Sequence, residues 1–199
     1  MTITLTNEVL RRACEKQLGI RPEDGKLHIF GIRGASRFAP PNTVQFHDNP
    51  PDLWNDTIGV FGTQLAAYPG TTDPGAIPAK RPTNPGGAAY LLPGRYRYKR
   101  GKHRGKWALV QASGVNVRRD RDRDGRPENN EPISYNVWIG LNCHRGGVGI
   151  HVADWGAGCQ VVKGQYWDLF YAPIIDCDPP PYIGDVKFDY WLLDRRGFE

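Results

Sequence analysis

The first residues of the chain carry its clearest helical pattern. Between Thr6 and Gly19, apolar side chains recur three and four positions apart, which places them on one face of a helix. These positions are Val9, Leu10, Ala13, Cys14 and Leu18. The Thr6 side chain can cap the amino end of this helix, and Gly19 can end it. The pattern predicts an N-terminal helical segment within residues 1–25 that buries Cys14 as a core thiol.

Beyond residue 25 the apolar runs become short, and Gly, Pro, Asn and Asp separate them. Runs of this kind predict strands, and they lie at 26–32, 57–61, 106–112, 115–117, 134–141, 149–152 and 185–193. A second short helix is expected at 166–171, and the prolines at 179–181 predict a turn. We expect a single domain over 1–199 of the mainly β (α+β) class, with a β-rich core at 60–199.

Composition narrows the class of protein. The 199 residues are 39% hydrophobic and 24% charged, which excludes a disordered chain. No apolar run approaches the roughly 18 residues of a membrane span. The amino end lacks the basic start and apolar stretch of a secretory signal. These features predict a chain made in the cytoplasm without a signal peptide and with no membrane span.

The net charge of +5 is concentrated in one segment. Seven Lys or Arg residues and no acidic residue lie between Arg95 and Lys106. A solvated hairpin is the first interpretation of such a run. Phosphate binding with base stacking on Tyr96 and Tyr98 is the alternative. We expect no nucleic-acid partner.

The four cysteines form no C-x-x-C pair, so free thiols are expected. Cys159 follows Gly158 and lies downstream of His144 and His151. A thiol nucleophile needs a base that takes its proton and a donor that holds the oxyanion. Either histidine can serve as the base, and glycine lets the backbone approach a substrate carbonyl. The alternative is that Cys159 is simply buried and the histidines satisfy hydrogen bonds.

The segment from Asn142 to Val161 resembles the active-site motif of L,D-transpeptidases, in which a histidine precedes Ser/Thr-His-Gly-Cys by about fourteen to seventeen residues. It is closer to a phage-type variant that ends in Ala-Gly-Cys-Gln-Val. Gly156 and Ala157 stand where that family has Ser/Thr and His, and Val161 replaces its usual arginine. The resemblance implies Cys159 as nucleophile, His144 as base and Gly158 in the oxyanion region, with His151 as the competing base. It places Asn142, Arg145, Trp155 and Gln160 toward the substrate.

The resemblance implies the catalytic fold of that family and a cysteine enzyme acting on peptidoglycan peptides through a thioacyl intermediate. Hydrolysis is favoured over transpeptidation, as in a phage lysin or a delivered toxin that acts in the cell wall or periplasm. One alternative is a non-enzymatic phage or envelope-binding module. The other is a zinc-dependent peptidoglycan hydrolase in which His144, His151, Asp154 and Cys159 converge on the metal.

A second motif runs from Asp120 to Glu131 and matches D-x-[DN]-x-[DN]-G-x5-E without a mismatch. Calcium binds six to eight oxygens. Here they would come from Asp120, Asp122, Asp124, the Arg126 carbonyl and Glu131. The flanking runs predict strands, so the loop is not an EF-hand. A structural calcium ion is one interpretation, and a solvated loop of alternating charge is the other. No cofactor for catalysis is expected.

Overall fold

The computed structural model describes residues 1–47, 52–126, 130–178 and 183–199. Strands account for 39% of the chain and helices for 18%, so the predicted mainly β (α+β) class is confirmed. The predicted turn at 179–181 and residues 127–129 of the acidic loop lie outside the described residues. No helix among the described residues is long and apolar enough to cross a membrane.

The described part of the chain alternates short strands with a few helices. The first half contains β1 (Thr2–Thr4), α1 (Asn7–Leu18), β2 (His28–Ile32), β3 (Ala35–Phe38), β4 (Thr43–Phe46), β5 (Asp56–Phe61), β6 (Ala66–Thr71), α2 (Ala76–Lys80) and β7 (Ala88–Leu91). The second half contains β8 (Gly94–His103), β9 (Lys106–Gln111), β10 (Val115–Asp120), β11 (Ile133–Val137), β12 (Cys143–Arg145), β13 (Gln160–Val162), α3 (Trp167–Cys177) and β14 (Lys187–Leu193). Single-turn 3-10 helices at Gly164–Tyr166 and Arg195–Gly197 precede α3 and follow β14.

Eight strands close into a barrel in the order β12-β13-β6-β5-β2-β14-β8-β9. The pairs β12–β13 and β14–β2 are parallel, and the other pairs are antiparallel. One antiparallel pairing, Cys143 with Leu109, joins β12 to β9 and completes the ring. The ring is therefore completed at β12, one of its shortest strands. The cysteine motif lies at this seam between β12 and β9.

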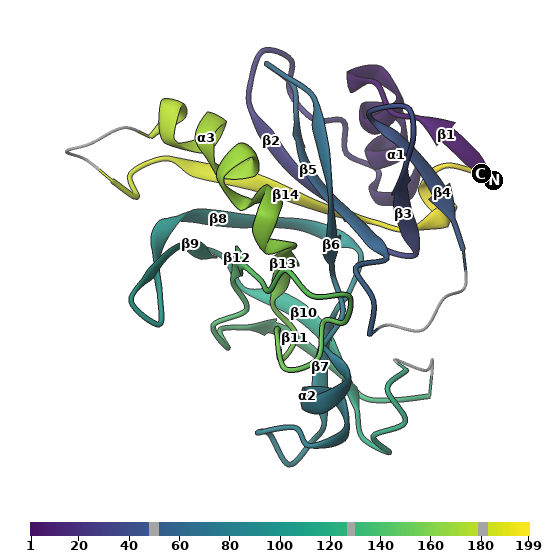
Figure 1. The fold of residues 1–199 in the computed structure, drawn as a ribbon, viewed down its shortest axis with the longest axis vertical. Helices are drawn as coiled ribbons and strands as arrows, with labels where there is room; N and C mark the ends of the chain where they lie inside the picture. The colour runs from purple at the N-terminus through teal and green to yellow at the C-terminus, as the bar shows by residue number, and fades with distance from the viewer. Residues whose placement is uncertain (48–51, 127–129, 179–182) are drawn as a thin grey trace.

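Two three-stranded sheets flank the barrel, in the orders β1-β4-β3 and β11-β10-β7. Figure 1 shows the first sheet beside α1 and both chain ends, and the second at the opposite end of the molecule near α2. One apolar core combines residues of the barrel with one face of α3, and Tyr98 and Tyr190 meet edge to face within it. A second core lies under α1. The barrel thus lies between the two three-stranded sheets (Figure 1).

The N-terminal helix forms as the sequence predicts. The Thr6 hydroxyl accepts the Val9 amide at 3.1 Å, and Gly19 ends the helix with φ +69°. Cys14 is fully buried, and burial raises the pKa of its thiol to about 12. Its role as a core thiol is confirmed.

The strand predicted at 149–152 is wrong, and the one predicted at 134–141 ends early, because β11 stops at Val137. Residues 149–152 form only an isolated bridge, between His151 and Leu53, and Ile150 is 75% exposed. The β-rich core also begins well before residue 60, because β2 and β5 belong to the barrel. The sequence did not predict β12 and β13, because strands of three residues are too short to show an alternating pattern of apolar and polar side chains.

The basic segment is a hairpin, as expected, made by β8 and β9 with His103 opposite Lys106. Alternation along β8 turns Tyr96 and Tyr98 inward, where both are buried. These two rings are therefore unavailable for stacking on bases, and the nucleic-acid alternative loses its aromatic component.

A buried carboxylate ties the barrel strands together at one end. Asp56 Oδ1 accepts the Gly34 amide at 2.7 Å, and Oδ2 accepts the amide and hydroxyl of Thr72 at 2.6 and 2.8 Å. Asp56 is only 2% exposed and Thr72 is fully buried, so without this carboxylate the amide and hydroxyl of Thr72 lose their acceptor inside the core. The single side chain holds the turn after β2 and the residue after β6 to β5.

We expect Asp56→Ala to lower the free energy of unfolding by about 3 kcal/mol, because it leaves buried amides without an acceptor. In a chain of this size the melting temperature should fall by roughly 10 °C, as measured by circular dichroism. Asp185→Ala, at an exposed position, is the matched control and should change it by about 1 °C or less. Equal melting temperatures for the two variants would contradict the anchoring role.

Candidate active site

The parallel pairing of β12 with β13 brings the two halves of the cysteine motif together. Gln160 lies opposite Cys143, and the Gln160 amide donates to the Asn142 carbonyl at 2.8 Å. Cys159 therefore lies beside Asn142, whose backbone amide donates to its Sγ at 3.4 Å. Side chains alternate along β12, so Cys143 enters the barrel core and His144 faces the other way.

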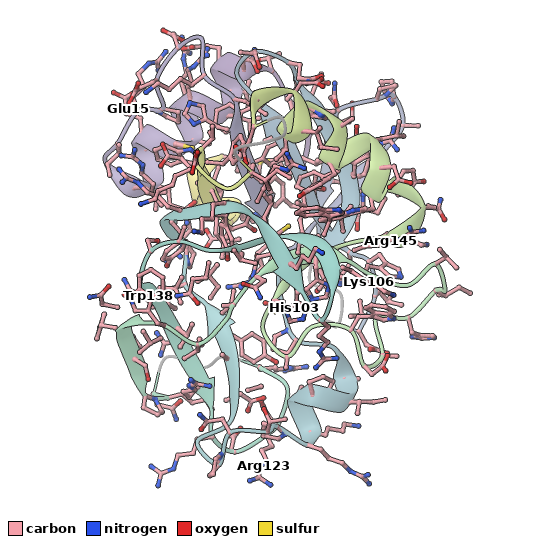
Figure 2. The ribbon with its side chains drawn as sticks, turned by 90° about the vertical axis from the view of Figure 1, so that its left-hand side faces the viewer. Glu15, His103, Lys106, Arg123, Trp138 and Arg145 are labelled. Carbon is pink, nitrogen blue, oxygen red and sulfur yellow. The ribbon has the colours of Figure 1, made fainter. Side chains whose placement is uncertain are left out.

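Cys159 and His144 line one cavity of about 730 Å³. Its walls also carry five cationic side chains, from Arg81, Arg104, Lys106, Arg119 and Arg145, and one carboxylate, Asp154. Apolar surface comes from residues that include Ile77, Leu141, Trp107 and Trp155. Figure 2 shows His103, Lys106 and Arg145 on the same side of the molecule, near its middle. The cavity suits an anionic ligand with an apolar part.

His144 is arranged to accept a proton. Its Nδ1 lies 2.9 Å from the Arg145 carbonyl, and because a carbonyl only accepts, Nδ1 carries the hydrogen. Nε2 is then the basic nitrogen. Burial, with smaller contributions from His103 and Arg104, lowers the pKa of His144 to about 4. The imidazole is therefore neutral and able to act as a base at neutral pH.

Cys159 is a neutral thiol in this arrangement. Its side chain is 9% exposed, and burial raises its pKa, while the hydrogen bond from the Asn142 amide acts in the opposite direction. Sγ donates to the Gly140 carbonyl at 3.8 Å, and no hydrogen bond among the described residues joins it to His144. The pair is thus a thiol and an imidazole rather than an ion pair.

The backbone at Gly158 has a conformation that requires glycine. Its φ is +115°, and a Cβ there would lie 2.4 Å from the Ala89 carbonyl oxygen. The amide of Cys159, which follows, donates to none of the described hydrogen bonds. This amide is the donor in the site that can stabilise an oxyanion formed next to Sγ.

His103 is a site residue that the sequence did not reveal. Its ring stacks on that of His144 with centroids 4.8 Å apart and an interplanar angle of 12°. The Asn142 side-chain amide donates to His103 Nδ1 at 3.0 Å, and its oxygen accepts the Gln111 amide, which fixes the amide orientation. His103 lies within the basic run, at the end of β8, where the charge pattern dominates, and no spacing rule links it to His144.

The other predicted substrate residues divide into two groups. Arg145 and Trp155 line the cavity, as expected. Asn142 is 7% exposed and holds His103 and Cys159 in place rather than facing a ligand. The prediction for Gln160 is wrong, because its side chain is fully buried and bonds to Tyr190 and to the carbonyls of Thr72 and Gly158. Its amide therefore holds the Gly158 carbonyl, directly before Cys159, against the interior of the barrel.

His151 is not the competing base. Its side chain is 64% exposed and lies outside the cavity lining, and Nδ1 is 3.1 Å from Asp52 Oδ2. The zinc alternative fails for the same reason. Among the described residues, the metal-binding atoms of His144, His151, Asp154 and Cys159 form no close group.

The structure brings the predicted calcium ligands partly together. Oxygens of Asp120, Asp122 and Asp124 lie within 4.8 Å of one another. Glu131 bonds through Oε1 to the Arg121 amide, and the Arg126 side chain is exposed. This cluster lies at the end of β10, outside the cavity lining.

No protein-family model, no curated protein and no solved structure matches this chain.

The four thiols are expected to differ in alkylation rate. Cys177 is exposed, so the test uses a Cys177→Ser background. There, iodoacetamide should modify Cys159, which lines the cavity, before the core thiols Cys14 and Cys143. Because its pKa is raised, the rate should grow about tenfold per pH unit up to pH 9. Peptide mass spectrometry gives the order; protection of Cys159 equal to that of Cys14 would exclude an accessible thiol.

Proposed function

We propose that this protein is a cysteine enzyme that cleaves amide bonds in peptidoglycan peptides through a thioacyl intermediate. The observation that carries the proposal is the cavity shared by Cys159 and His144, with the His144 tautomer fixed so that Nε2 is basic. The similarity of this segment to L,D-transpeptidases supplies the substrate class. The amide of Cys159 and the cationic walls are consistent with it.

The reaction begins with proton transfer from Cys159 to His144. The thiol leaves the Gly140 carbonyl, its proton passes to Nε2, and Sγ forms a bond to the substrate carbonyl carbon. The carbonyl oxygen takes the negative charge, which the Cys159 amide stabilises. Collapse breaks the C–N bond, and the amine leaves with the proton from His144. Water then attacks the thioester with His144 as base, releasing the acid and restoring the thiol.

The cavity walls favour a substrate that carries carboxylates. Arg104, Lys106 and Arg145 surround the histidine side of the cavity against the single acid Asp154. Stem peptides of peptidoglycan carry free carboxylates next to the amide bonds that are cut. Trp155 and Trp107 offer apolar surface to the uncharged part of such a peptide. Water as acceptor gives a peptidase and an amine gives a transpeptidase; we favour hydrolysis, in the cell wall or periplasm, as for a lysin or a delivered toxin.

Cys159→Ala should abolish the release of peptides from purified peptidoglycan, because it removes the sulfur that forms the acyl intermediate in this mechanism. Mass spectrometry of digests with wild type and variant identifies the product and the bond. His151→Ala is the matched control and should retain activity, since His151 lies outside the cavity. Equal product from Cys159→Ala would reject the thiol mechanism, and binding without product from the wild type would reject the enzyme in favour of an envelope-binding module.

His103 is proposed as a positioning residue that keeps His144 in place and shielded from water. With the pKa of His144 at about 4, kcat/KM should stay level from about pH 5 to 8 and fall only as His144 is protonated below that range. His103→Ala exposes His144, so its pKa should rise toward 6.5 and the acid limb should move to higher pH.

His103→Phe keeps a stacked ring and serves as the matched variant; its acid limb should stay near that of the wild type. His144→Ala should lower kcat by about 10²–10⁴-fold. An unchanged acid limb in His103→Ala, with the variant folded by circular dichroism, would refute the shielding role.

A further inference from the structure

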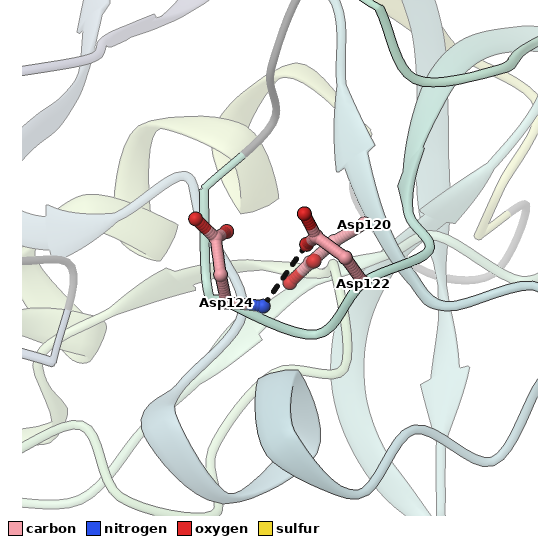
Figure 3. Close-up of side chains that lie close together, drawn as sticks. All are labelled: Asp120, Asp122 and Asp124. Atoms are coloured by element: carbon pink, nitrogen blue, oxygen red, sulfur yellow. Dashed lines mark hydrogen bonds between the residues drawn. The ribbon is translucent and has the colours of Figure 1, made fainter.

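The loop after β10 gathers three carboxylates around one point. The oxygens of Asp120, Asp122 and Asp124 lie within 4.8 Å of one another, and Figure 3 shows the three side chains close together on this loop. Asp122 and Asp124 are exposed, whereas Asp120 is fully buried. No ion pair among the described residues includes any of the three. Their negative charges are close together without a cationic side chain between them.

Asp120 has one carboxylate oxygen without a partner. Oδ2 accepts the Gly125 amide at 3.0 Å, whereas Oδ1 is buried and makes no hydrogen bond. A buried carboxylate oxygen with no donor is costly and calls for a partner that the protein itself does not provide. A cation between the three carboxylates supplies that partner.

Two further described positions of the loop fit the calcium-binding pattern. Gly125 takes φ +84°, and its amide returns to Asp120 Oδ2. Glu131, twelfth in the pattern, is buried, and its Oε1 accepts the Arg121 amide. The last carboxylate of the motif therefore bonds to the backbone directly after Asp120.

We propose that this loop binds one calcium ion. Asp120 Oδ1, the carboxylates of Asp122, Asp124 and Glu131, and the Arg126 carbonyl would hold it. All of these donors are oxygens, which hard cations prefer, and a loop that lies between two strands tolerates the irregular coordination of calcium better than the strict octahedron of magnesium.

The site is independent of the thiol chemistry but adjoins its cavity. On β10, Arg119 lines the cavity and pairs with Ala89, and Asp120 pairs with Ala88. The Ala89 carbonyl in turn packs against Gly158. An ion at Asp120 would hold the end of the strand that supports this wall.

The experiment is thermal unfolding of the full chain after chelator treatment, with and without added calcium, together with calorimetric titration. At free calcium about 100-fold above Kd, the melting temperature should rise by about 5–10 °C, and the titration should show one ion per chain. The same concentration of magnesium should raise it by less than half as much.

Asp122→Ala should remove the calcium response, and Asp124→Ala provides a second exposed ligand position in case the first variant folds poorly. Asp185→Ala is the matched control; it removes an exposed carboxylate outside the loop, so its response should match the wild type. The proposal is overturned if calcium leaves the wild-type melting temperature unchanged, or if Asp122→Ala and Asp124→Ala retain the full shift.

Discussion

One buried side chain, Gln160, holds the backbone around Cys159. Its amide donates to the carbonyls of Thr72 and Gly158, at 3.4 and 3.3 Å, while its oxygen accepts the Tyr190 hydroxyl at 2.6 Å. Thr72 is in turn held by Asp56. This buried polar network joins β5, β6, β13 and β14 beneath Cys159. Satisfied networks of this kind specify a single arrangement, because any other leaves buried polar atoms unpaired.

The barrel seam explains why thiol and imidazole line the same cavity. Strands β12 and β13 are three residues long, so the chain leaves β12 directly after Arg145 and enters β13 directly after Cys159. Free backbone at a strand end is where a glycine can adopt φ +115° and leave a following amide unpaired. The buried network of Gln160 and the short strands β12 and β13 therefore place Cys159 and His144 at the edge of a well-packed barrel. Functional side chains are often found on loops that such a scaffold positions.

Burial sets the chemical state of the site. Lowering the pKa of His144 and raising that of Cys159 both favour the neutral forms, so in the proposed reaction the thiol must lose its proton as sulfur attacks. The surrounding cations Arg104, Lys106 and Arg145 do not form ion pairs with the described residues, which leaves them available for an anionic ligand. The cavity therefore combines a neutral thiol and a neutral imidazole with cationic side chains around them.

The sequence by itself determined what depends on local order. The helix from Asn7 to Leu18 follows from apolar spacing and its two caps, and the mainly β class follows from short apolar runs between turns. The residue types of the cysteine segment pointed to Cys159 with His144 or His151 as its base, and the resemblance favoured His144, which the structure places in the cavity with Cys159. The tertiary structure alone decided that His103 stacks on His144, that His151 turns to Asp52 and that Gln160 is buried. Each of these depends on strand register and on contacts between residues far apart in the chain, and one position of register sends a side chain to the opposite face of a sheet.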